Sequence, residues 1–136
     1  MEQLFTSNEC DIFYNDELGI VQTQWKGIFV SGNEFRKILD EVINALSAKQ
    51  TSTIIADVRN MKVIAEADRQ WIVDDWYPRA LKAGFRCQAI VVTKNSFNEQ
   101  SIKLIVTKYN DEDVKTRYFF ALEDAFAWVK EGALQV

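Results

Sequence analysis

The sequence of 136 residues predicts a single α/β domain whose elements follow the order β-β-α-β-α-β-α-β-α. Three observations predict it: two continuous apolar segments without polar alternation, amphipathic helical segments between and after them, and an opening pair of short segments rich in β-forming residues. Strands that alternate with helices form parallel sheets with right-handed crossovers. We therefore expect a mostly parallel sheet with an antiparallel first strand, in one domain over residues 1–136.

The opening hairpin is predicted over residues 10–15 and 19–27, on either side of the turn sequence NDELG. In its second strand Val21, Thr23 and Trp25 alternate with polar residues, so one face of the hairpin should meet a core. Residues 1–6 are expected to be either a frayed arm or part of the first strand.

The two continuous apolar strands are predicted over residues 53–58 and 87–93, and a last strand over residues 115–120. Two S-x-x-E capping boxes, beginning at Ser31 and Ser96, each precede an apolar helical face. A further helix is predicted over residues 65–83, ended by Gly84, and a final helix from residue 122. Pro78 lies inside the helix of residues 65–83 and is expected to kink it near Trp76.

The composition excludes several classes of function. Histidine is absent, which removes Ser-His and Cys-His nucleophiles and every metal site that uses imidazole. A net charge of −4 argues against nucleic acid and anionic membranes as partners. No glycine-rich phosphate loop occurs, and no acidic residues converge on one site. We therefore expect no catalytic residues, no cofactor and no metal.

The two cysteines, Cys10 and Cys87, are expected to be buried thiols and not a disulfide or a metal clip. The first residues lack the basic start and apolar run of a signal peptide, and no segment approaches the length of a membrane span. The sequence thus predicts a cytoplasmic protein.

The order of elements, together with residues 56–60 (ADVRN), Trp71, residues 76–80 (WYPRA) and Gly84, resembles the small STAS-like domains, which share the fold of anti-sigma-factor antagonists. The resemblance implies a non-catalytic domain that binds a protein partner. In the family's best-understood members that partner is a kinase, and a serine in the loop after the third strand is phosphorylated. From Val58 to Asp68 this sequence has no serine or threonine, so we expect an interaction surface there without a phosphoserine switch.

Candidate binding residues occur first at the edge of the sheet where the strand-to-helix loops gather. They are Asp57, Arg59 and Asn60 after one apolar strand, and Asn95 and Ser96 after the other. One interpretation is a polar cluster that binds a ligand or a partner. The other is that Asp57 accepts hydrogen bonds from the N–H groups of its own loop and pairs with Arg59.

A second group of candidates, Trp71, Asp75 and Arg79, is predicted on the outer face of the helix of residues 65–83. At about 100° per residue, Trp76 falls in the middle of the apolar face, whereas Trp71 falls roughly 140° away. Trp71 would then either contact a ligand or another chain, or be covered by a loop or the chain terminus. Asp75 and Arg79 have the spacing of a helix-stabilising ion pair.

The sequence and the resemblance together favour a STAS-like regulatory domain that binds an unidentified protein or forms a homodimer. The alternative is a small apolar ligand or lipid held beneath the proline-kinked helix. Four aromatic residues are its candidate walls: Trp71, Tyr77, Phe85 and Phe97.

Overall fold

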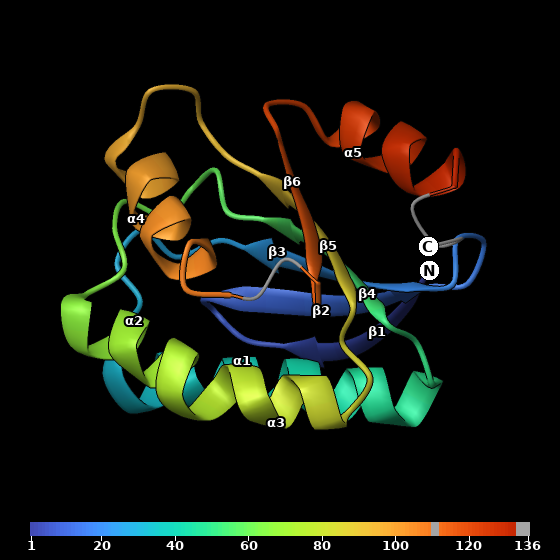
Figure 1. The fold of residues 1–136 in the computed structure, drawn as a ribbon, viewed down its shortest axis with the longest axis horizontal. Helices are drawn as coiled ribbons and strands as arrows, with labels where there is room; N and C mark the ends of the chain where they lie inside the picture. The colour runs from blue at the N-terminus through green and yellow to red at the C-terminus, as the bar shows by residue number, and fades with distance from the viewer. Residues whose placement is uncertain (110–111, 133–136) are drawn as a thin grey trace.

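The computed structural model describes residues 1–109 and 112–132, which form one mixed sheet with helices on both of its faces (Figure 1). The sheet has six strands in the order β1-β2-β3-β4-β5-β6. The pairs β1–β2 and β2–β3 are antiparallel, whereas β3, β4, β5 and β6 run parallel to one another. Their bounds are Glu2–Thr6, Cys10–Asn15, Ile20–Trp25, Thr53–Asp57, Cys87–Val91 and Lys115–Phe119. The predicted α/β class and the mostly parallel sheet are confirmed.

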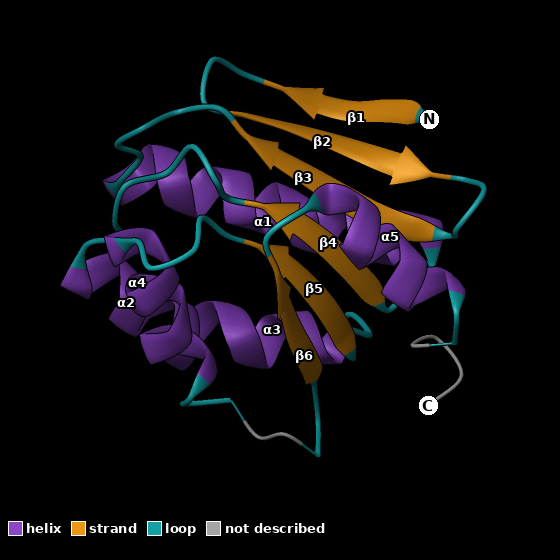
Figure 2. Cartoon of the chain, turned by 90° about the horizontal axis from the view of Figure 1, so that it is seen from above, coloured by secondary structure: helices purple, strands orange, loops and turns teal. Residues whose placement is uncertain are grey.

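The helices divide unequally between the two faces (Figures 1 and 2). One face is covered by α1, by the helical segment α2–η1–α3 and by α4, while α5 alone lies on the other face. Their bounds are Gly32–Lys49 (α1), Glu66–Trp71 (α2), Ile72–Trp76 (η1), Tyr77–Lys82 (α3), Phe97–Val106 (α4) and Leu122–Lys130 (α5). None of the described helices is both long and apolar enough to cross a membrane.

Alternation along the strands creates a separate core on each face. In β4, Ile54 packs in the larger core beneath α1 and α2–α3, while Ile55 packs in the smaller core beneath α5. Every residue of β5 is buried. This two-sided burial explains why residues 53–57 and 87–91 show no polar alternation in the sequence.

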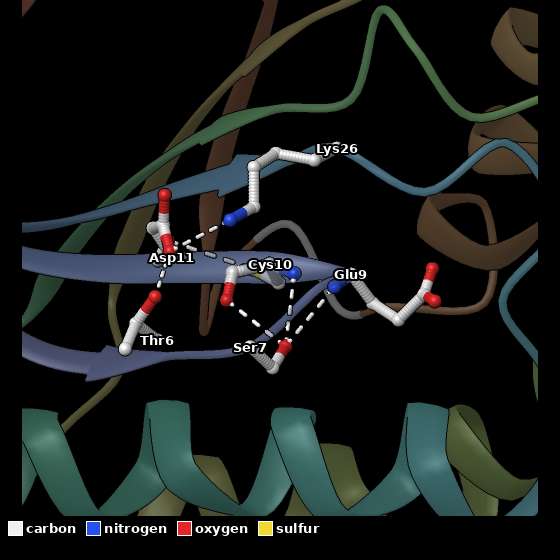
Figure 3. A network of polar contacts seen from close by, with 6 residues as sticks. All are labelled: Thr6, Ser7, Glu9, Cys10, Asp11 and Lys26. Atoms are coloured by element: carbon white, nitrogen blue, oxygen red, sulfur yellow. Dashed lines mark hydrogen bonds and ion pairs between the residues drawn. The ribbon is translucent and has the colours of Figure 1, made fainter.

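The N-terminal residues form a strand of their own, which the predicted order lacked. Thr6 donates from its hydroxyl to Asp11 Oδ1 at 2.6 Å, and Lys26 Nζ lies 3.0 Å from the same oxygen. Ser7 Oγ accepts hydrogen bonds from the backbone N–H groups of Glu9 and Cys10, which closes the β1–β2 turn (Figure 3). The sequence did not predict β1 because this edge strand is exposed. None of its residues is fully buried, so its sequence shows no alternation of apolar and polar residues.

The helical segment of residues 66–82 passes Pro78 without the expected break. Instead, a π-helical turn occupies Ile72–Trp76, in which the Tyr77 N–H donates to the Ile72 carbonyl, five residues back. The wider turn places Pro78 in the first turn of α3, where a missing N–H costs no helical hydrogen bond. Trp76 is in the core, as predicted, and Gly84 follows the segment with φ +107°.

Both predicted cysteine thiols are buried and free. Burial, together with the neighbouring Asp11 charge, raises the pKa of the Cys10 thiol to about 12. Among the described residues, no group of three Cys, Asp or Glu side chains could hold a metal ion.

Candidate functional site

The loops that follow β3, β4 and β5 gather at the carboxyl edge of the parallel strands, as predicted (Figure 2). They line a groove of about 580 Å³. Four of the predicted site residues are among its lining residues: Arg59, Asn60, Asn95 and Ser96. The fifth, Asp57, is buried at the end of β4 behind Arg59.

The carboxylate of Asp57 is satisfied by its own loop. Its Oδ1 accepts hydrogen bonds from Arg59 N–H at 3.2 Å and Nε at 2.9 Å, and its Oδ2 lies 2.6 Å from Arg59 Nη2. Burial alone would raise the pKa of this carboxyl, but the hydrogen bonds and charge of Arg59 outweigh that effect and lower the pKa. The second interpretation of Asp57 is therefore confirmed: it organises the loop and orients Arg59.

Neighbouring segments hold the β4–α2 loop in place. The N–H of Lys62 donates to the Ile28 carbonyl at 2.9 Å, and the Thr93 hydroxyl donates to the Arg59 carbonyl at 3.3 Å. The buried side-chain amide of Asn98 donates to the Val58 carbonyl at 2.6 Å. The loop therefore presents its outer side chains from a backbone fixed on both sides.

Asn95 and Ser96 build the start of α4. Ser96 Oγ accepts from the Glu99 N–H at 3.0 Å, and the Glu99 carboxylate accepts from the Asn95 N–H at 3.0 Å. Asn95 has φ +58°, a conformation that asparagine tolerates better than most residues. The second capping box is thus formed, with the backbone donor one residue earlier than in the standard motif.

Exposed apolar side chains surround the same groove, and sequence reasoning did not identify them as a group. Ile28 and Val63 line the groove with exposed fractions of 51% and 43%, and Phe97 lines it with 78%. Phe29, next to Ile28 in the chain, is 75% exposed. The sequence signal was available: these apolar residues stand in two loops and at the first position of a helix, where polar residues are expected.

The other predicted group, Trp71, Asp75 and Arg79, lies away from the groove, between the α2–α3 segment and α1. Arg79 Nη2 lies 2.7 Å from Asp75 and 2.8 Å from Asp40 of α1, so the predicted ion pair is present and extends to a second helix. Trp71 is half-buried, with the guanidinium carbons of Arg36 and Arg79 at 5.4 and 5.7 Å from its ring centroid. Trp71 is thus flanked by arginine side chains of α1 and α3, and its contact with a ligand or another chain stays a prediction.

The four predicted walls of the apolar ligand site beneath the helix of residues 65–83 do not come together. Phe85 is fully buried against Trp76, Tyr77 stacks on Tyr109, and Phe97 is exposed at the sheet edge. These side chains therefore do not share a cavity with Trp71. A cavity of about 90 Å³ does lie beneath this helical segment, where Ile72 and Trp76 line it, but none of the four candidate walls is among its lining residues.

Comparison with known proteins agrees with this geometry at the level of the fold. A crystal structure of an anti-sigma factor antagonist from Mycobacterium paratuberculosis matches 93% of this chain over 99% of its own length, with a TM-score of 0.57 and 16% sequence identity. No family model and no curated protein matches the chain in sequence. The described chain therefore has the STAS fold of anti-sigma-factor antagonists, as the sequence resemblance implied.

Proposed function

We propose that this chain is a non-catalytic regulatory domain that binds a protein partner at the carboxyl edge of its parallel sheet. The observation that supports it is the convergence of Ile28 and Val63, from two loops, and Phe97, the first residue of α4, on one groove. Exposed apolar patches bordered by polar side chains are typical of protein interaction sites. The structural neighbour is itself described as an antagonist of anti-sigma factors, which favours a partner of protein nature.

Charge indicates the chemistry of that partner. The groove is lined by Lys26, Arg59 and Lys62, although the chain as a whole carries a net charge of −4. Lys26 and Arg59 are paired with Asp11 and Asp57, which neutralises much of their charge, so the exposed Lys62 supplies most of the groove's positive charge. A complementary partner segment would present apolar side chains together with Asp or Glu.

The mode of regulation should differ from a phosphoserine switch in the β4–α2 loop. Residues 58–68 contain no hydroxyl side chain, and the loop's polar contacts are made by Asp57, Arg59 and backbone groups. We therefore propose that partner binding does not depend on phosphorylation of this loop. Nothing in the proposal uses the Trp71 face, whose side chains are occupied in contacts between helices.

The test compares surface variants in quantitative pull-down and native mass spectrometry. Phe97→Ala and Lys62→Glu should each weaken partner binding about tenfold or more without changing stability, because both side chains are exposed. Leu104→Ala is the matched control, since Leu104 is a 56% exposed apolar residue of the same helix outside the groove's lining.

A protein that is retained by the wild type and by Leu104→Ala but released by both groove variants supports the proposal. Equal retention by all four proteins contradicts it. A homodimer that Phe97→Ala dissociates would assign the groove to self-association and overturn the proposed acidic partner.

A further inference from the structure

A cavity that is partly open to solvent lies between the sheet and the helices α1, η1 and α4, within the larger core. Its volume is about 90 Å³. Its walls are almost wholly apolar; they include Leu39 from α1, Ile72 from η1 and Ile105 from α4. A well-packed interior has few voids larger than a water molecule, so a cavity of this size needs an explanation.

On the sheet side, the cavity lies over the small side chain of Ala56 in β4. Ala56 of β4 is in register with Thr23 of β3 and with Ile90 of β5, and all three line the cavity. Although Ala56 is in a central strand, it is only partly buried. The space above Ala56 is therefore a gap in the core that solvent reaches.

Thr23 places an unpartnered hydroxyl at this gap. Its side chain is 3% exposed, and its Oγ1 has no hydrogen-bond partner in the described part of the chain. The other polar side chain of the floor, Gln88, donates to the Thr116 hydroxyl at 3.1 Å. A buried hydroxyl is nearly always paired in native proteins, so Thr23 has hydrogen-bonding capacity that a ligand could use.

The π-helical turn supplies part of the opposite wall. Ile72 and Trp76, the first and last residues of η1, both line the cavity. The Trp76 indole N–H is fixed by a hydrogen bond of 2.7 Å to the Leu39 carbonyl, so the ring offers the cavity only its apolar surface. Single π-helical turns occur frequently at functional sites.

We propose that this cavity binds a small, mainly apolar molecule with one hydroxyl or similar polar group, which pairs with Thr23. An apolar cavity of about 150 Å³ accommodates benzene, so this one suits ligands of no more than about six non-hydrogen atoms. A water molecule is a poorer occupant, because it requires two to four polar partners. The proposal stands independently of the proposed partner site, although Met61 lines both the cavity and the groove.

The experiment titrates two probes, cyclopentanol and cyclopentane, which share a ring and differ in one hydroxyl. Isoleucine methyl NMR of the full chain reports binding: Ile54, Ile72 and Ile90 line the cavity. Ile20 and Ile55 lie in the core beneath α5 and serve as internal controls. Both probes should shift the methyl signals of the cavity isoleucines and leave the two control signals unchanged.

Two variants separate the cavity from its polar anchor. Thr23→Val keeps the shape and removes the hydroxyl, so it should weaken cyclopentanol binding about five- to tenfold and leave cyclopentane binding unchanged. Ala56→Leu fills the cavity and should abolish binding of both probes, with Ala56→Val as the smaller replacement if the leucine variant does not fold.

The proposal is overturned if neither probe shifts the cavity methyl signals up to its solubility limit. It is equally overturned if Thr23→Val changes the affinity for both probes to the same extent, because the hydroxyl would then have no role in recognition. Either result would leave the partner-binding proposal unaffected, because that proposal is tested separately by pull-down.

Discussion

The carboxylate of Asp68 caps helix α1 from another helix. Its Oδ2 accepts a hydrogen bond from the Gly32 backbone N–H at 3.1 Å, and its Oδ1 accepts one from Arg36 Nε at 3.2 Å. Asp68 belongs to α2, thirty-six residues further along the chain, and is 2% exposed. Ser31, which the sequence predicted as the capping side chain, occupies the N-cap position but makes no side-chain cap hydrogen bond.

Replacing Asp68 should therefore destabilise the protein more than replacing Ser31. Asp68→Ala removes the acceptor of an N-terminal N–H and leaves Arg36 without its carboxylate, so it should lower the free energy of unfolding by about 1–2 kcal/mol. Ser31→Ala should change it by less than about 0.5 kcal/mol. Urea unfolding of the two variants measures both values, and an equal loss for Ser31→Ala would show that the cap has been assigned to the wrong side chain.

The second capping box should behave in the opposite way. Ser96 Oγ accepts the Glu99 N–H at 3.0 Å and donates to the Thr93 carbonyl at 2.6 Å. Ser96→Ala should therefore lower the free energy of unfolding by about 1 kcal/mol. Ser96→Thr retains the hydroxyl and is the control; the assignment fails if both variants are equally destabilised in urea.

The Asp57–Arg59 pair predicts a pH dependence of stability. The pKa of Asp57 is lower in the folded protein than in the unfolded chain, so the unfolded chain binds more protons as the pH falls below about 4. The stabilisation by Asp57 is therefore complete above that pH and is lost as the pH falls through the folded-state pKa. Urea unfolding at a series of pH values from about 6 to 3 should show the free energy of unfolding decreasing as the pH falls.

Two variants isolate this pair. Asp57→Asn removes the carboxyl group that titrates. The free energy of unfolding of this variant should therefore fall less at acidic pH than that of the wild type, and the two curves should converge at low pH. Arg59→Ala should cost about 1–3 kcal/mol at neutral pH because a buried carboxylate loses its partner, whereas Arg59→Lys should cost less. Parallel curves for Asp57→Asn and wild type would contradict the lowered pKa.

The cysteine thiols should resist alkylation in the folded state. Cys10 is fully buried and its thiol pKa is raised to about 12, so at pH 8 the fraction in the reactive thiolate form is on the order of one in ten thousand. Burial also raises the pKa of Cys87. Mass spectrometry after iodoacetamide treatment should find neither thiol labelled in buffer and both labelled in denaturant. Rapid labelling of Cys10 in buffer would contradict its burial.

Most of the fold could be predicted because its signals are short-range. The face formed by Phe35, Ile38, Val42 and Leu46 repeats with helical spacing, and all four residues are buried in the core. The strands β4 and β5 could be recognised because both of their faces are buried. By contrast, β1 has no such pattern: it is an edge strand recognised only through its pairing with β2.

The candidate site was predicted only in part, for a related reason. The position of Asp57 and Arg59 at the carboxyl edge follows from strand order, and their pairing follows from their proximity in the chain. The convergence of Ile28, Val63 and Phe97 does not follow from the sequence, because it depends on how two loops pack against the start of α4. Trp71 lay beyond local prediction too, since arginines of two helices cover it.

The sequence by itself determined the order of the elements from β2 onward, the helix ended by Gly84, the burial of Trp76 and the two thiols, and the absence of imidazole chemistry. These properties depend on composition and on contacts within a few turns of the chain. Only the tertiary structure decided that Asp68 caps α1, that the π-helical turn η1 precedes Pro78, and that Ala56 leaves a cavity beside Thr23. Each of these depends on which distant side chains meet when the layers pack.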